Sequence, residues 1–310
     1  MGSGRSGTTL LRAIFDSHPD LAIPDEVSFV IRLSRPHYAR RYGWHRRFDA
    51  EPCLDLLLAN GSLQRWQLPD DEIRSALLSP QAASSFAEAV RRLYRLWAAH
   101  QGKPRYGDKT PMHVLYLPRL ARMFPEARFV HLVRDGRDVA LSYRTTSWGP
   151  AGIEDAAVEW RRRVARGRRA GARLGPDRYL EVRYEDLVAE PEPFVRRLCE
   201  FIDLRWDDGL LRYYERAGDV IAATRFPEAH QRLLLPPTVG LRDWRRDMEP
   251  ADVARFEAIG GRLLAELGYE VTTPPANGLD RLRADAKVAA AFASRSWSSA
   301  IGGGRVLVGR

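Results

Sequence analysis

The stretch that decides the fold opens the chain: Met1-Gly2-Ser3-Gly4-Arg5-Ser6-Gly7-Thr8-Thr9-Leu10-Leu11. Gly2 and Gly7 have the spacing of a phosphate-binding loop, in which backbone N–H groups surround an anion at the start of a helix. The lysine that follows the second glycine in ATP- and GTP-binding loops is absent, because Thr8 occupies that position. Arg5 supplies a charge from inside the loop instead, and the two threonines supply hydroxyls. The sequence therefore favours an ordered binding loop over a disordered Gly/Ser-rich terminus. It also favours a nucleotide ligand whose 5′ end is not a triphosphate.

An amphipathic helix and a short return strand follow the loop. The apolar residues on one helical face are Leu10, Leu11, Ile14 and Phe15. Asp16-Ser17-His18-Pro19 ends the helix, since proline keeps the residue before it out of the helical region. A short extended run then delivers two adjacent carboxylates, Asp25 and Glu26. The order is phosphate loop, helix, return strand and acid pair.

A second segment has the same character. Phe129–Val133 is short, apolar and β-branched, which predicts a buried strand. It leads into Arg134-Asp135-Gly136-Arg137-Asp138 and then a helix that contains Ser142. Ligands of open parallel sheets bind at the carboxyl ends of strands, and a guanidinium fits a phosphate well. Alone, the segment could be a solvated turn, but a second phosphate-type segment in the same chain weakens that interpretation.

Together these segments resemble the sulfotransferases that use 3′-phosphoadenosine 5′-phosphosulfate (PAPS). The resemblance rests on Arg5-Ser6-Gly7-Thr8-Thr9, on Asp16-Ser17-His18-Pro19 and on the acid pair, and it is closest to the protein-tyrosine sulfotransferases and their bacterial relatives. The Lys-Ser-Gly-Thr-Thr form of the cytosolic small-molecule enzymes is not present. The resemblance implies a transferase with PAPS as sulfuryl donor, bound by the loop residues Arg5, Ser6, Gly7, Thr8 and Thr9. No metal is expected, because the leaving group is already activated.

Further nucleotide contacts follow from the resemblance. It implies that Arg134 and Ser142 bind the 3′-phosphate and that Tyr184, at the end of a strand predicted over 178–184, contacts the nucleotide, although Tyr184 could equally pack in the core. A looser third match is Arg242-Asp243-Trp244-Arg245-Arg246, which precedes the final helix. There we assign Trp244 and Arg245 to the nucleotide. Arg242 and Arg246 remain alternatives to Arg245, and a core tryptophan with solvent-facing arginines is the competing interpretation.

Sulfuryl transfer needs a base for the acceptor proton and cations for the charge on the transferring group. The resemblance implies that Glu26 is the base. Alternatively, the acid pair caps the next helix, or a histidine is the base, with His113 and His131 as candidates and His131 more suited to a buried strand.

Lys109 precedes Thr110-Pro111, a good start for a helix. That places Lys109 beside the positive end of a helix, where an anion is favoured. The resemblance implies that Lys109 meets the sulfonate, and we assign it, with Arg5, to stabilising the transferring group. A surface lysine before a helix is the competing interpretation.

The predicted fold class is α/β, with a P-loop-type parallel sheet flanked by helices and a helical insertion after the first βα unit. We expect one domain over residues 1–271, with the insertion at about 29–101. Residues 272–310 carry Pro-Pro, Ala and Ser/Gly clusters, which predicts a weakly ordered tail.

A phosphate loop normally follows a buried strand, but here only Met1 precedes it. We therefore expect the start to be truncated or misassigned, with upstream codons for an apolar, β-branched run. An alternative is that Arg305-Val306-Leu307-Val308-Gly309 folds back into the missing place.

Two other classes of function are open to a basic chain with such a loop. The formal net charge is +9, but the arginines are spread along the chain, and runs such as Arg161–Arg163 suggest one face of an exposed helix. A nucleic-acid-binding protein would need a clustered basic face, which the sequence lacks. A P-loop kinase or NTPase would need the missing lysine and a magnesium-holding acid, for which Asp135 is the only near candidate.

The remaining expectations concern the acceptor and the compartment. Peptide tyrosine, a carbohydrate, a lipid headgroup and a small phenol are all open as acceptors. Cys53 and Cys199 are far apart and without metal spacing, so we expect core thiols and a cytoplasmic protein. No apolar run is long enough to span a membrane, and no charged-then-apolar leader is evident.

Overall fold

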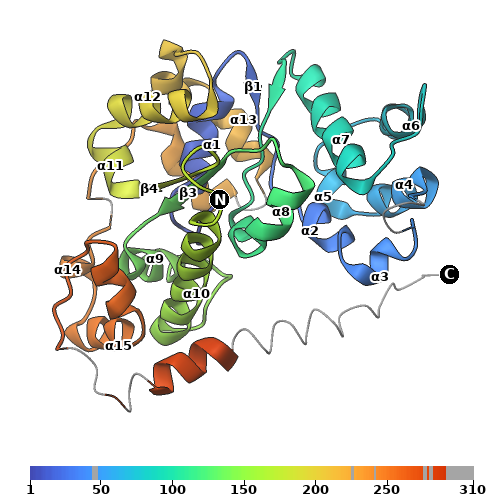
Figure 1. The fold of residues 1–310 in the computed structure, drawn as a ribbon. Helices are drawn as coiled ribbons and strands as arrows, with labels where there is room; N and C mark the ends of the chain where they lie inside the picture. Colours follow the sequence, from blue (N-terminus) through green and yellow to red (C-terminus); the bar gives the residue numbers. More distant parts are fainter. Residues whose placement is uncertain (44–47, 225–226, 241, 275–277, 279–281, 291–310) are drawn as a thin grey trace.

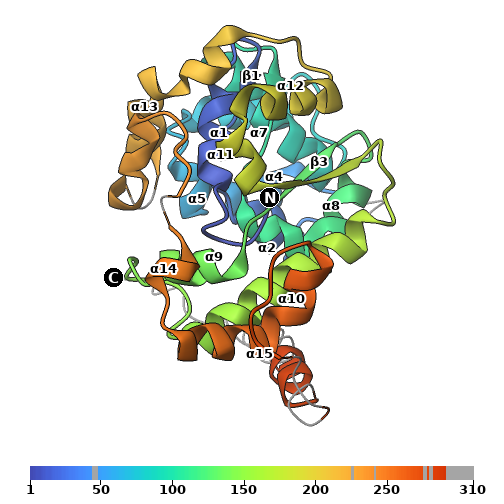
Figure 2. The ribbon, with the colours of Figure 1, turned by 90° about the vertical axis from the view of Figure 1, so that its left-hand side faces the viewer.

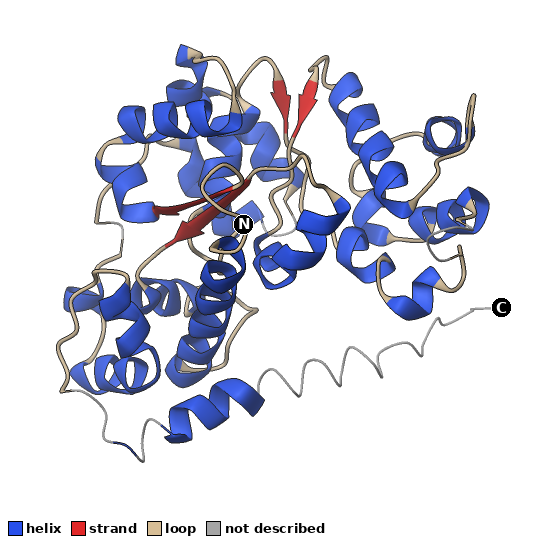
Figure 3. Cartoon of the chain, in the orientation of Figure 1, coloured by secondary structure: helices blue, strands red, loops and turns tan. Residues whose placement is uncertain are grey.

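The computed structural model describes residues 1–43, 48–224, 227–240, 242–274, 278 and 282–290. It is a mostly helical α/β structure with two small parallel sheets (Figure 3). Strand β1 (Leu21–Ala22) pairs with β2 (Arg105–Tyr106), and β3 (Phe129–Val133) pairs with β4 (Tyr179–Arg183). The strand predicted over 129–133 is therefore confirmed, and the one predicted over 178–184 is present but one residue shorter at each end. The predicted single parallel sheet is divided into two pairs.

The start of the chain lies beside β3. Gly2 forms a parallel bridge with Leu132. The ammonium of Met1 donates to the carbonyl oxygen of Val130 at 3.1 Å, and the Leu132 N–H donates to the Met1 carbonyl at 3.0 Å. The Gly2 N–H donates in the other direction, to the Pro111 carbonyl at 3.3 Å. The phosphate-type loop thus begins from a backbone that is tied to two separate parts of the fold.

The first helix follows the loop, and a helical region follows β1. Helix α1 spans Thr8–Asp16, as the apolar spacing predicted. The described residues between 29 and 100, on the right in Figure 1, then form helices and no strand, as expected for the insertion. These helices are α2 (Phe29–Leu33), α3 (Pro36–Ala39), α4 (Ala50–Leu58), α5 (Gly61–Gln64), α6 (Asp70–Leu78) and α7 (Phe86–His100). Asp49, Asn60 and Ser85 accept backbone N–H groups as side-chain caps of α4, α5 and α7.

The remaining helices surround the strand pairs. Figures 1 and 2 show α11 and α12 above β3 and β4, and α9, α10, α14 and α15 below them. Their bounds are η1 (Pro111–Tyr116), α8 (Leu117–Met123), α9 (Gly136–Tyr143), α10 (Ile153–Gly171), α11 (Tyr184–Ala189), α12 (Pro191–Ile202), η2 (Asp208–Glu215), α13 (Ala217–Ala223), η3 (Pro227–Leu234), α14 (Trp244–Asp247) and α15 (Pro250–Glu266).

The end of the chain is described in part. Gly268, with a φ of 76°, follows α15 at the C′ position, where the left-handed conformation favours glycine. Residues 282–290 are helical. Most of the predicted tail, including the segment 305–309 considered as a returning strand, lies outside the described residues, so its order stays a prediction.

Helix α10 corrects the expectation of an exposed arginine face. Its side chains pack against α9 and α15, and Trp160 is fully buried between them. Arg162 is 7% exposed at its side chain and pairs with Glu159 at 2.8 Å. A run of arginines suggests an exposed helix face. Here the arginine can be buried, because a carboxylate one helical turn earlier neutralises its charge.

Arg137 connects several residues of the region below β3. It is fully buried, and its guanidinium contacts Asp135 at 2.7 Å and Glu257 of α15 at 2.5 Å. The same guanidinium lies 3.5 Å from the centroid of the Trp244 ring. Trp244, which the sequence assigned to the nucleotide, is 5% exposed and packs in this core instead.

Replacing Arg137 should therefore destabilise the fold. Arg137→Met leaves two buried carboxylates without their cation, so we expect the free energy of unfolding to fall by about 3–5 kcal/mol in urea titrations. Arg262→Met is the control, because Arg262 pairs with Glu266 at an exposed position of α15. A loss below about 1 kcal/mol for Arg137→Met, similar to that of an exposed pair, would contradict the role of Arg137.

Candidate functional site

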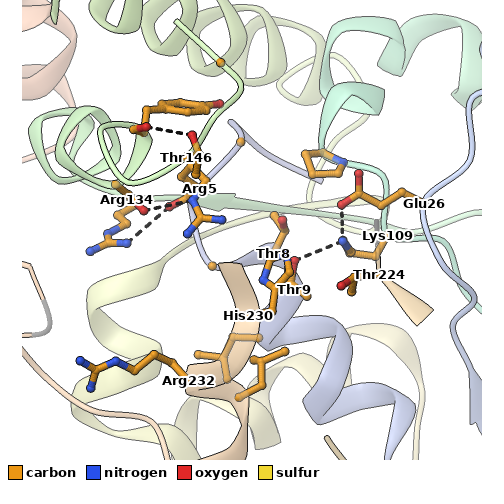
Figure 4. A pocket seen from close by; sticks show the side chains of 18 of the residues that line it. Arg5, Thr8, Thr9, Glu26, Lys109, Arg134, Thr146, Thr224, His230 and Arg232 are labelled. Carbon is orange, nitrogen blue, oxygen red and sulfur yellow. Dashed lines mark hydrogen bonds and ion pairs between the residues drawn. The ribbon is translucent and has the colours of Figure 1, made fainter. Parts of the chain in front are cut away.

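A cavity of about 1250 Å³ lies at the start of α1. Figure 4 shows the side chains that converge on it from both sides of the loop. Most residues predicted from the sequence line it: Arg5, Gly7, Thr8, Thr9, Glu26, Lys109, Arg134, Ser142 and Tyr184. The fold thus brings the loop, the acid pair and the segment after β3 into one place.

The loop presents free backbone donors to the cavity. Gly7 is the N-cap of α1 in the left-handed conformation, with a φ of 87°. A Cβ atom there would lie 2.3 Å from the ring of Tyr184, so the position requires glycine. The first helical hydrogen bond runs from the Leu11 N–H to the Gly7 carbonyl at 3.0 Å, so the N–H groups of the first turn have no acceptor within the helix. The first turn carries no acidic residue, and the site suits an anion.

One end of the cavity holds Arg5 and Arg134. The Arg5 Nε donates to Ser142 Oγ at 3.0 Å, and Arg134 Nη1 donates to the Arg5 carbonyl at 3.4 Å. The Arg134 guanidinium lies 4.4 Å from the centroid of Tyr184, and its Nε is buried without a hydrogen-bond partner among the described residues. The nearest carboxylate, Asp138, is 3.9 Å away. Burial and then repulsion from neighbouring arginines lower the pKa of Arg5.

The other end holds a buried lysine beside a carboxylate. Lys109 is 6% exposed, forms an ion pair with Glu26 and donates to Thr9 Oγ1 at 3.3 Å. Burial lowers the pKa of Lys109, and Glu26 opposes that shift. The Glu26 side chain is 43% exposed, so it can also be reached from the cavity. This end combines a proton acceptor, a cation and the positive end of α1.

Asp25 anchors the backbone that carries Glu26. It is 5% exposed, and its carboxylate lies 3.5 Å from Arg12 of α1 and 2.8 Å from Arg65 of the insertion. Arg65 also donates to the Glu26 carbonyl at 2.5 Å, and the Trp66 indole N–H donates to the Asp25 carbonyl at 3.2 Å. We call Arg12, Asp25 and Arg65 the Asp25 clamp.

The clamp resolves one sequence alternative and adds residues that the sequence did not reveal. The acid pair does not cap the next helix, because Ser28 is the N-cap residue of α2. Arg12 carried a weak signal, since it stands between Leu11 and Ala13 in an otherwise apolar helix start. Arg65 carried none, because its role depends on a contact across 40 positions of the sequence.

The histidines are placed differently from the alternatives considered. His113 is held by Asp108 at 2.7 Å and His131 by the Tyr179 hydroxyl at 2.6 Å, and neither lines the cavity. His230 of η3 does line it, opposite the start of α1 in Figure 4. Burial and the nearby Arg5 and Lys109 lower the pKa of His230 to about 4, so this imidazole is neutral at physiological pH.

Other predicted contacts lie away from the cavity. Trp244 and Arg245 do not line it, and Arg245 pairs with Glu270 at 2.5 Å. Of the three arginines considered there, Arg242 is the one that lines the cavity, with its Nη2 donating to Thr145 Oγ1 at 3.1 Å. The Ser6 side chain is buried behind the loop.

The magnesium-holding acid that a kinase would need has no counterpart here. Asp135 caps α9 and is bound by Arg137, and it does not line the cavity. Among the described residues there is no group of three or more side chains that could hold a metal ion. No helix in that part of the chain is long and apolar enough to cross a membrane.

Comparisons with known proteins agree with this geometry. The model of the sulfotransferase family matches residues 1–208. Protein-tyrosine sulfotransferase 1 of Danio rerio is 28% identical over 285 residues, which cover 89% of this chain and 73% of that protein. The human protein-tyrosine sulfotransferase 1 is 26% identical, with 89% and 70% covered. A solved sulfotransferase domain from the curacin biosynthetic pathway shares the fold, with a TM-score of 0.55, 18% identity and coverage of 87% of this chain and 96% of that one.

The Asp25 clamp should contribute strongly to stability. Asp25→Asn leaves buried Arg12 without a carboxylate, so we expect the free energy of unfolding to fall by about 3 kcal/mol in chemical denaturation. Glu51→Gln is the matched control, since Glu51 pairs with Arg74 at the surface of the same insertion and should change stability by less than about 1 kcal/mol. Equal effects of the two substitutions would show that the clamp adds nothing beyond a surface pair.

Proposed function

This chain belongs to the sulfotransferase family, and we propose that it moves a sulfuryl group from PAPS to a hydroxyl acceptor with Glu26 as the base. The observation that carries the proposal is the arrangement around the start of α1. Free N–H groups and Lys109 lie beside Glu26 at one end, and Arg5, Arg134 and Ser142 lie together at the other. A donor with phosphate groups at both its 3′ and 5′ positions needs two such anion sites.

The residues present fit PAPS. The unpaired Nε of buried Arg134 and the neighbouring Ser142 hydroxyl supply donors for the 3′-phosphate. The first turn of α1, with the hydroxyls of Thr8 and Thr9, supplies donors for the 5′-phosphosulfate. Tyr184 packs against both Gly7 and Arg134, which fixes the spacing between the two anion sites. Arg242 replaces Arg245 in this assignment, because Arg242 lines the cavity.

The reaction exchanges one sulfur–oxygen bond for another. Glu26 accepts the proton of the acceptor hydroxyl, whose oxygen forms the new bond to sulfur. The bond from sulfur to the phosphate oxygen breaks, and adenosine 3′,5′-bisphosphate leaves. Lys109 and the first turn of α1 stabilise the charge on the transferring group and on the departing oxygen.

The ion pair between Lys109 and Glu26 gives the lysine two tasks. Without substrate, Lys109 neutralises Glu26 and contacts Thr9 at the start of α1. When the donor is bound, the sulfonate competes for the same ammonium, and the Glu26 carboxylate becomes a stronger proton acceptor. Donor binding thereby prepares the base for the acceptor.

A tyrosine side chain of a peptide is the first acceptor to test. The relatives named above are protein-tyrosine sulfotransferases and cover most of this chain. The cavity volume of about 1250 Å³ also exceeds the roughly 300–1,000 Å³ typical of a site for one small ligand, which leaves room beside the nucleotide. His230 and Met112 on its wall would lie beside such an acceptor.

We also propose a reducing, cytoplasmic compartment. Cys53 and Cys199 are both buried and unpaired, and burial raises the pKa of each thiol. Such thiols are inert packing residues, and they form no disulfide that would require an oxidising compartment.

The role of the base is tested by Glu26→Gln. The amide keeps the shape of the side chain but cannot accept the proton, so turnover should fall by roughly 100-fold or more. Affinity for adenosine 3′,5′-bisphosphate, measured by calorimetry, should change little. Turnover near that of the unmodified protein would remove Glu26 from the role, and His230→Gln, assayed in parallel, tests the imidazole on the wall.

The donor site is tested by Arg134→Ala. We expect affinity for the bisphosphate to fall by about 10-fold or more, because a charge-assisted contact is lost. Ser142→Ala should have a smaller effect, since its hydroxyl is neutral. Arg245→Ala is the control and should leave affinity unchanged, because Arg245 lies off the cavity. If Arg134→Ala binds the bisphosphate normally, the 3′-phosphate lies elsewhere.

A further inference from the structure

The proposed base and the proposed cation stand on two loops. Glu26 lies between β1 and α2, and Lys109 lies between β2 and η1. Figure 4 shows the two side chains meeting, where they form the ion pair. Neither backbone belongs to a helix or a strand at these positions, so no such element fixes the distance between the two side chains.

The hydroxyl of Thr110 connects the two loops. It accepts the Val27 N–H at 3.2 Å and donates to Asp108 Oδ2 at 3.1 Å. One hydroxyl can do both, because it has one hydrogen and two lone pairs. Val27 is the residue after Glu26, and Lys109 is the residue before the threonine. This buried side chain therefore ties the backbone beside the base to the backbone beside the cation.

Asp108 holds the Thr110 hydroxyl in this orientation. Its Oδ1 accepts the Thr110 N–H at 3.1 Å and the His113 Nδ1–H at 2.7 Å, and its Oδ2 also accepts the Tyr94 hydroxyl at 2.7 Å. Burial alone would raise the pKa of Asp108, but His113 and the hydrogen bonds outweigh it, so the pKa lies below its ordinary value. The carboxylate therefore remains an acceptor, and the donors around it fix its place.

The insertion supports the same connection. Tyr94 belongs to α7, and its ring lies edge-on to Trp66 with the ring centroids 4.9 Å apart. The Trp66 indole N–H donates in turn to the carbonyl of Asp25, the residue before Glu26. The two loops are thus held by one aromatic pair of the insertion as well as by Thr110. A shift of one loop against the other has to break at least one of these contacts.

We propose that Thr110 is a positioning residue for sulfuryl transfer, and that its hydroxyl sets the relative position of Lys109 and Glu26. The inference rests on the proposed function, in which Glu26 takes the acceptor proton and Lys109 meets the sulfonate. The acceptor oxygen then has to lie between the base and the sulfur atom, where a misplacement of about 1 Å can cost roughly 100-fold in rate. Thr110 also lines the cavity, so direct contact with a substrate is the competing role.

The first test needs no acceptor. Thr110→Val replaces the hydroxyl by a methyl group and removes both hydrogen bonds, whereas Thr110→Ser keeps them. Acetic anhydride should label Lys109 about 5-fold faster in Thr110→Val than in Thr110→Ser or the unmodified chain, because the lost hydrogen bonds make local opening easier. Lys103, whose ammonium donates to the carbonyls of Asp16 and Leu21, is the internal reference in the same mass spectra. Equal labelling of Lys109 in all three chains would overturn the proposal.

The second test measures turnover with PAPS and a peptide that contains a single tyrosine. Thr110→Val should lower kcat about 10-fold or more, whereas affinity for adenosine 3′,5′-bisphosphate should change less than about 2-fold, because the residues assigned to its phosphates are untouched. Thr110→Ser should stay within about 3-fold of the unmodified chain. Thr273→Val is the matched control, since it also removes a hydroxyl that donates to a carboxylate, that of Glu257 at 2.7 Å, but away from the cavity. A kcat of Thr110→Val equal to that of the control would contradict the positioning role.

Adding Thr110→Val to Glu26→Gln separates positioning from direct contact with a substrate. If the hydroxyl acts through Glu26, the added substitution should cost less than about 3-fold in kcat in that background. A further loss as large as in the unmodified chain would show that Thr110 acts on the substrate itself, which overturns the proposal. Normal turnover of Glu26→Gln would instead refute the proposed base, and the labelling of Lys109 would still decide the role of Thr110. Asp108→Asn replaces Thr110→Val in each test if that variant does not fold, since an amide nitrogen in place of Oδ2 cannot accept the Thr110 hydroxyl.

Discussion

The unpaired N–H groups at the start of α1 set the electrostatics of the whole cavity. They cannot be satisfied within the helix, and the N-cap residue Gly7 has no side chain to cap them, because Tyr184 occupies the space of a Cβ atom. Arg5 and Lys109 add positive charge to the same region. Burial lowers the pKa of both side chains, and repulsion from neighbouring arginines adds to the shift at each. The site is therefore organised for a negatively charged ligand before one is bound.

The position of Glu26 depends on residues that are far from it in the sequence. Arg12 lies on the helix that follows the loop, and Arg65 lies at the end of a short helix in the insertion. The buried Asp25 carboxylate pairs with both arginines, and it therefore links the insertion to α1. Because Arg65 also binds the Glu26 carbonyl, a movement of the insertion would move the carboxylate that faces the cavity. The insertion thus helps to position the proposed base.

Local patterns in the sequence were enough to predict the parts that obey local rules. The loop with Gly7, the helix after it and the strand at 129–133 all depend on backbone conformation or on periodicity within a few residues. The separate roles of Glu26 and Lys109 were assigned from the family resemblance, and the structure places the two in an ion pair that was not expected. The sequence did not reveal Arg65 or His230, because neither has a neighbour in the sequence that marks it as part of a site.

The misplaced residues have a common physical cause. Arg245 and Trp244 stood next to Arg242 in a basic run, and a sequence does not tell which arginine turns toward the cavity. The fold decides this through Glu270, which holds Arg245, and through Arg137, which stacks on Trp244. Likewise, the sequence suggested solvated arginines on α10, whereas the buried Glu159 pairs with two of them in the structure.

A buried carboxylate determines whether an arginine is structural or available to a ligand. Arg137 contacts both Asp135 and Glu257 at hydrogen-bonding distance, so its positive charge is neutralised within the core. Arg134 lies only three residues earlier, yet its closest carboxylate is 3.9 Å away and its Nε has no hydrogen-bond partner among the described residues. The strand-to-helix turn after β3 therefore sends one guanidinium into the core and the other to the cavity. The same short, arginine-rich motif stabilises the fold and supplies the charge for an anion.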